Sequence, residues 1–179
     1  MTIRWLLNNI INGYIYSTLI VLIISSAGIF SKLKTEKYLN KANLSILIIL
    51  FIHLIYAFIR TPFLVAEYNT YTAGDTSDKI WITNFYNYTH LLITIAFGFL
   101  FHLIFIYQKN RINFRYTIFS VVLLFILVHL GNIIVLGVRY KDNFSSAVPQ
   151  YFFNTTNLSY IAIFSLLFFI IHWLIKKDE

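Results

Sequence analysis

The stretch from Tyr86 to Tyr140 decides the fold of this chain: YNYTHLLITIAFGFLFHLIFIYQKNRINFRYTIFSVVLLFILVHLGNIIVLGVRY. It consists of two long apolar segments joined by a short basic turn, residues 108–115. About 20 apolar residues in a helix cover the hydrocarbon core of a bilayer, so each segment is long enough to cross it. Three of the five histidines, His90, His102 and His129, lie in this stretch. The pattern therefore predicts a membrane hairpin that carries ionisable side chains inside its apolar segments.

The composition of the whole chain agrees with a membrane location. Of its 179 residues, 59% are hydrophobic and only 12% are charged, with a mean hydropathy of +0.72. Soluble domains have about a quarter of their residues charged. The absence of cysteine excludes disulfides, iron–sulfur ligation and thiolate metal sites. The net charge of +7 lies in short segments beside apolar ones, which indicates membrane orientation and no nucleic-acid partner.

Five apolar segments are predicted to span the membrane, at about residues 10–30, 44–61, 86–107, 116–138 and 158–175. The sequence thus predicts an all-α integral membrane protein, a bundle of five transmembrane helices in a single transmembrane domain covering residues 1–179. Residues 31–43, 63–85, 108–115 and 139–157 are expected to be the connecting loops. None of them is long enough for a soluble domain.

The basic residues concentrate in segments that alternate crossing of the membrane would place on one side. Residues 31–43, 108–115 and the C-terminus contain nine of the 14 Lys and Arg, whereas residues 63–85 and 139–157 contain four of the seven acids. The positive-inside rule then predicts an N-terminus outside and a C-terminus in the cytoplasm. The expected location is a bacterial cytoplasmic membrane or an organelle inner membrane, with the lipid bilayer and other membrane subunits as partners.

All five histidines fall inside the predicted spans: His53, His90, His102, His129 and His172. An ionisable group in hydrocarbon costs a few kcal/mol, so an intramembrane histidine is a functional hypothesis by default. The alternative is structural, because a neutral imidazole can also join helices by hydrogen bonds. Five histidines on four helices favour a shared purpose over five separate structural roles.

The depths of the histidines predict two layers. At the helical rise, His102 and His172 lie about 6–8 Å from the inner ends of their spans, and His129 and His90 lie at about 20 and 26 Å. His53 falls between the layers, at about 14 Å. Two layers of paired imidazoles are the ligand arrangement of a cytochrome with two b-type haems.

In this hypothesis His102 and His172 ligate an inner haem iron, and His90 with His129 (or His53) an outer one. Gly98, four residues before His102, would leave room for the macrocycle. His90 and His102 are 12 residues apart, which places them about 120° apart around one helix, so both can be ligands only if they face different partners or the helix is irregular. The pattern of five helices with histidines on several of them resembles, in architecture only, the cytochrome b anchor subunits of succinate dehydrogenases and fumarate reductases.

The leading functional hypothesis is therefore a membrane subunit of a respiratory-type electron-transfer complex that binds haem b and exchanges electrons with quinone or a partner subunit. The second is a cofactor-free accessory subunit, whose histidines only pack and bridge helices. A small transporter or ligand-binding protein, and a protein that binds copper or another metal through imidazoles, also fit the residues. The sequence does not decide whether the protein is an enzyme.

Overall fold

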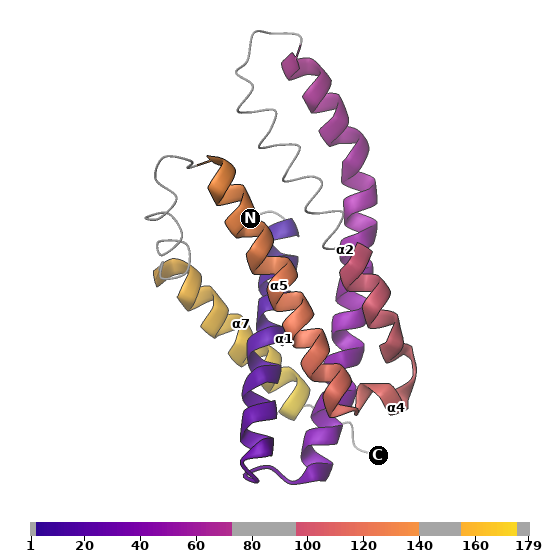
Figure 1. Ribbon diagram of the computed structural model, residues 1–179, viewed down its shortest axis with the longest axis vertical. Helices are drawn as coiled ribbons and strands as arrows, with labels where there is room; N and C mark the ends of the chain where they lie inside the picture. The colour runs from indigo at the N-terminus through magenta and orange to yellow at the C-terminus, as the bar shows by residue number, and fades with distance from the viewer. Residues whose placement is uncertain (1–2, 73–95, 140–154, 175–179) are drawn as a thin grey trace.

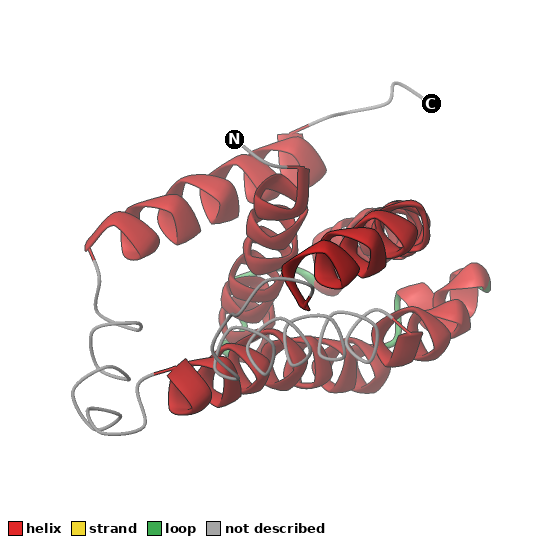
Figure 2. Cartoon of the chain, turned by 90° about the horizontal axis from the view of Figure 1, so that it is seen from above, coloured by secondary structure: helices red, strands yellow, loops and turns green. Residues whose placement is uncertain are grey.

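The computed structural model describes residues 3–72, 96–139 and 155–174, and every element in these ranges is helical. Figure 1 shows the long helices, some of which are inclined to one another, and Figure 2 shows them from above. Helix α1 (Ile3–Ser26) packs against α7 (Thr155–Leu174), α2 (Lys32–Thr72) and α5 (Phe114–Arg139). The predicted all-α class is confirmed for the part of the chain that the structure describes.

A tight turn joins α1 to α2. The N–H of Gly28 donates to the carbonyl of Ser25 and that of Ile29 to the carbonyl of Ile24, which is the Schellman pattern of a helix C-terminus. This pattern needs a left-handed residue, and Gly28 supplies it with φ +76°. Ser31 then caps α2, because its Oγ accepts the N–H of Lys34 at 3.4 Å.

The chain between residue 96 and α5 (Phe114–Arg139) is irregular. Residues 96–102 are helical and tighten into the 3-10 turn η1 (Leu103–Ile106), after which Tyr107 is extended. One helical turn, α4 (Gln108–Arg111), precedes α5. Asn113 caps α5, because its Oδ1 accepts the N–H groups of Arg115 and Tyr116 at 2.9 and 3.4 Å.

Several predicted loops are helical, and these expectations were wrong. Residues 32–43 belong to α2, which starts directly after its Ser31 cap and runs in one piece through Pro62 to Thr72, so residues 63–72 are helical too. The basic turn contains α4. The predicted bounds of the spans followed apolarity, which indicates the part of a helix that is compatible with lipid. The ends of a helix are set instead by its capping residues and backbone hydrogen bonds. Residues 86–95, the start of the predicted third span, lie outside the described residues.

By length and composition, two of the described helical stretches can cross a membrane, Trp5–Ser26 and Lys32–Ile59. Shorter apolar helices comprise Ala96–Ile106, Phe114–His129 and Leu158–Trp173. Helices α1 and α7 approach each other closely at Gly13, where an added Cβ would lie 2.7 Å from the carbonyl oxygen of Phe164 in α7. Glycine at this position therefore allows the backbones of α1 and α7 to touch.

Candidate functional site

His102 lies at the end of the helical segment 96–102 and has no exposed surface. Its Nδ1 lies 2.5 Å from the carbonyl oxygen of Gly98, one turn earlier, and its Nε2 lies 2.5 Å from Oγ of Ser120 in α5. Because a carbonyl oxygen only accepts, Nδ1 carries the hydrogen in this arrangement. A neutral His102 therefore presents the lone pair of Nε2 to the Ser120 hydroxyl.

His172, near the end of α7, repeats this arrangement against a different helix. Its Nδ1 lies 2.7 Å from the carbonyl oxygen of Phe168, and its Nε2 lies 2.7 Å from Oγ of Ser45 in α2. The Phe168 ring stacks on the imidazole with centroids 4.0 Å apart, and the Tyr38 ring meets it edge-on at 6.4 Å. The ring of His172 is thus held both by hydrogen bonds and by aromatic packing.

Ser120 connects His102 to a buried polar network across three helices. The Tyr14 hydroxyl in α1 lies 2.9 Å from Ser120 Oγ and donates to Oδ1 of Asn43 in α2 at 2.7 Å. Nδ2 of Asn43 donates to the backbone carbonyl of Arg111 at 2.6 Å and to Oγ1 of Thr117 at 2.7 Å. The network thereby joins α1, α2 and α5 with α4 and the segment that carries His102.

The hydrogens of this network can be counted. Thr117 donates its hydrogen to the carbonyl of Asn113 at 3.0 Å, so it must accept from Asn43, and this fixes the orientation of the Asn43 amide. The Tyr14 hydrogen then points to Asn43. The single hydrogen of Ser120 can point to His102 or to Tyr14, but not to both. With a neutral His102 the network therefore has two alternative hydrogen arrangements, which differ at Ser120.

The remaining histidines that the structure describes are His129 and His53. Nε2 of His129 in α5 is 3.3 Å from the hydroxyl of Tyr16, and the Phe125 ring lies 4.6 Å from its imidazole. His53 is buried within α2, at 2% exposure. His90 lies outside the described residues, so the predicted outer pair of His90 and His129 stays a prediction.

The predicted inner pair, His102 and His172, is linked by hydrogen bonds to two residues in the same turn of α2. His172 bonds Ser45 directly, and His102 reaches Asn43 through Ser120 and Tyr14. Asn43 and Ser45 are two residues apart, about 3 Å along the axis. However, the two Nε2 atoms are directed to different serines on different helices. In the ranges described, no group of three or more His, Cys, Asp or Glu is placed to hold a metal ion.

The paired Ser and His side chains raise the question of nucleophilic chemistry. Ser45 and Ser120 both lie within long helices, α2 and α5, where the neighbouring backbone N–H groups bond to carbonyls one turn earlier. These N–H groups therefore cannot stabilise an oxyanion beside the serine, as acyl transfer requires. The arrangement instead suits hydrogen bonding between helices.

The residues that sequence reasoning missed are polar but uncharged: Tyr14, Asn43, Ser45, Thr117 and Ser120. Four of them lie in helical stretches that are otherwise apolar, where small polar residues commonly bond across helices. That signal was present in the sequence. Asn43 had been assigned to a loop, and the choice of partners depends on helix rotation, which the sequence does not give.

Comparison with known protein families, with curated proteins and with solved structures found no match.

Proposed function

We propose that this chain is an integral membrane protein whose five apolar segments cross the bilayer. The support is the distribution of polarity in the described helices. Phe58, Phe97 and Leu166 are 66%, 63% and 60% exposed, whereas Asn43 and Ser120 have no exposed surface. In water an apolar exterior favours aggregation. In lipid it is well solvated, and internal polar contacts hold the helices together.

The proposed orientation places the N-terminus outside and the C-terminus in the cytoplasm. The three basic segments are residues 31–43, residues 108–115 and the C-terminus. Two observations support their placement at the same end of the bundle. Lys32 in the first turn of α2 and Arg115 in the first turn of α5 line the same cavity. Phe30, in the turn before α2, packs on Trp173 near the end of α7 with ring centroids 4.5 Å apart. Positive charge gathered at one end of a bundle marks its cytoplasmic side.

Single cysteines test this topology cleanly, because the chain has none of its own. A membrane-impermeant maleimide should label Asp75→Cys, in the acidic segment, on intact cells. It should label Lys34→Cys only after the membrane is permeabilised. The reverse pattern would overturn the orientation, and equal labelling of both positions in intact cells would overturn the spanning model.

Within the membrane, we propose that the chain acts as a cofactor-free helical subunit of a larger assembly. The observation that supports this role is that both ring nitrogens of His102 and of His172 lie within hydrogen-bond distance of protein atoms. Each histidine links its own helix to a serine of a neighbouring helix. In this role the two imidazoles are structural links, and the apolar exterior contacts lipid and neighbouring subunits.

Haem b binding is the second candidate, and one observation favours it. In His102 and His172, bonding of Nδ1–H to a carbonyl leaves Nε2 with a lone pair directed away from its own helix, which is the form that ligates a metal. A bound haem would carry one electron at a time between a quinone and a partner subunit. In the arrangement described, the hydroxyls of Ser120 and Ser45 occupy these two Nε2 positions, so the pair does not fit one iron without rearrangement.

A reduced-minus-oxidised absorption spectrum of the purified protein separates the two candidates. A cofactor-free subunit shows no α-band of b-type haem and yields no extractable haem. If an α-band is present and His172→Ala removes one component of it, the cofactor-free proposal is wrong. Ser26→Ala is the matched control, because this exposed hydroxyl donates to the carbonyl of Ile23 within its own helix α1.

Membership of an assembly is tested separately, by extraction in a mild detergent and native gel electrophoresis. The proposal expects the chain to migrate in a complex that contains other membrane polypeptides. Migration of a monomer or of a homo-oligomer alone, under conditions that preserve other membrane complexes of the same cells, would overturn it.

A further inference from the structure

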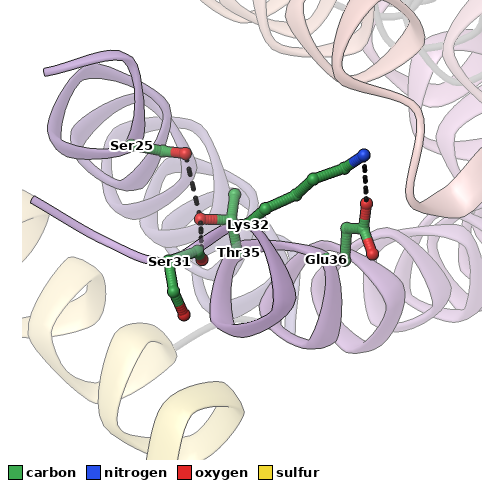
Figure 3. A network of polar contacts seen from close by, with 5 residues as sticks. All are labelled: Ser25, Ser31, Lys32, Thr35 and Glu36. Atoms are coloured by element: carbon green, nitrogen blue, oxygen red, sulfur yellow. Dashed lines mark hydrogen bonds and ion pairs between the residues drawn. The ribbon is translucent and has the colours of Figure 1, made fainter. Parts of the chain in front are cut away.

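A cavity of about 600 Å³ opens between the turn that joins α1 to α2 and the start of α5. Its size lies within the range of small-molecule sites. The lining includes two cationic side chains, Lys32 and Arg115, and one carboxylate, Glu36. Figure 3 shows Lys32 and Glu36 side by side on α2, with Nζ and Oε1 3.9 Å apart.

The backbone adds positive potential to this cavity. The first turns of α2 and α5 both contribute to its lining, and the N-terminus of a helix carries the positive end of its dipole. The Lys32–Glu36 pair is long and Lys32 is 91% exposed, so their mutual attraction is weak in water. Lys32 therefore stays available to an incoming anion.

The remaining wall of the cavity is apolar, with Phe30, Leu39 and Phe114 in the lining. These side chains lie beside polar ones from the adjoining helix ends, among them Thr35. The Thr35 hydroxyl bonds Oγ of Ser25 at 3.0 Å and thereby ties α1 to α2 at the cavity (Figure 3). A ligand that matches both the cationic part and the apolar wall of the cavity has an anionic group joined directly to a hydrocarbon portion.

We propose that this cavity binds the phosphate of an anionic phospholipid, with the start of its acyl chains against the apolar wall. The inference rests on the proposed membrane orientation, which places the cavity at the level of the cytoplasmic head groups. Basic pockets between helices on that side are suited to anionic head groups. Lys32 and Arg115 pair with the phosphate, whereas Glu36 opposes it and moderates its affinity.

The test measures lipid binding to the full chain in neutral detergent micelles, by native mass spectrometry and by tryptophan fluorescence during lipid titration. Phosphatidylglycerol should bind at least about five-fold more tightly than phosphatidylcholine, and Lys32→Gln and Arg115→Gln should each weaken it about five-fold. Glu36→Gln should strengthen it. Lys34→Gln and Lys37→Gln are matched controls, because both lysines are exposed on the same stretch of α2 and neither lines the cavity.

Three outcomes would overturn the proposal. Equal binding of the two lipids means that the cavity does not distinguish an anionic head group from a zwitterionic one. Equal losses in Lys34→Gln and Lys32→Gln assign the binding to diffuse surface charge. Competition by inorganic phosphate at similar concentrations assigns the site to a soluble anion. Binding in micelles does not depend on orientation, so a reversed labelling pattern with intact phosphatidylglycerol binding would refute the topology and leave the site standing.

Discussion

The phenol of Tyr14 in α1 donates a 2.7 Å hydrogen bond to Oδ1 of Asn43 in α2, and neither side chain has any exposed surface. Nδ2 of Asn43 also donates hydrogen bonds to the backbone carbonyl of Arg111 and to the hydroxyl of Thr117. One amide thus bonds three groups from three different parts of the chain. The helices meet at this residue through polar contacts that neither lipid nor an apolar core could supply.

Asn43→Leu is expected to lower the free energy of unfolding by about 2–3 kcal/mol, because it leaves several buried groups without partners. Tyr14→Phe should cost less, about 1 kcal/mol, since it removes one hydroxyl. Unfolding by sodium dodecyl sulfate in mixed micelles, followed by tryptophan fluorescence, measures both. Ser26→Ala is the control and should stay within about 0.5 kcal/mol of the parent protein. A stable Asn43→Leu variant would show that the network contributes nothing to folding.

Ser120→Ala is expected to destabilise the protein more than Ser45→Ala. Ser120 has no exposed surface, so its loss leaves Nε2 of the fully buried His102 without a hydrogen-bond donor, whereas Ser45 is only half-buried and its partner His172 keeps some exposed surface. A contact between membrane helices is worth about 0.6–1 kcal/mol, and a buried group left without a partner adds to that cost. The same unfolding assay ranks the two variants. Equal costs would mean that burial does not distinguish the two contacts.

Gly13→Ala is expected to separate α1 from α7. The new Cβ would lie 2.7 Å from the backbone oxygen of Phe164, which cannot rotate away, so the helices must shift apart. Gly98→Ala should be tolerated, because its Cβ would meet only side chains, at 3.7–3.8 Å. The midpoint of thermal unfolding in detergent compares the two. A Gly13→Ala variant as stable as Gly98→Ala would contradict the close approach of α1 and α7.

Gly28→Ala is expected to lower stability by about 1–2 kcal/mol, because φ +76° is unfavourable for a residue with a Cβ. The cost is purely conformational, since a Cβ at Gly28 has nothing within 4 Å. Gly28→Asn should recover part of the loss, because asparagine adopts the left-handed region more readily. Chemical unfolding of the three proteins measures the order, and an Ala variant more stable than the Asn variant would reject this account.

Sequence reasoning located the helices better than their ends. Apolarity marked the lipid-compatible part of α2 but missed residues 32–43 and 63–72, which are helical without being uniformly apolar. The turn at Gly28 and the caps at Ser31 and Asn113 set the actual starts and stops. In the candidate site, His102 and His172 lie in helices as predicted, and their predicted role as haem ligands stays a prediction.

What the sequence determined by itself was the helical class, the apolar character of the helices and the presence of imidazoles in those helices. These properties follow from residue type and from the helical repeat, and both are local. The tertiary structure decided which atoms the imidazoles meet. Nε2 of His102 faces Ser120 and Nε2 of His172 faces Ser45, at sequence separations of 18 and 127 residues. Such pairings depend on the rotation and height of each helix against its neighbours, which are set by close contacts such as that of Gly13 with Phe164.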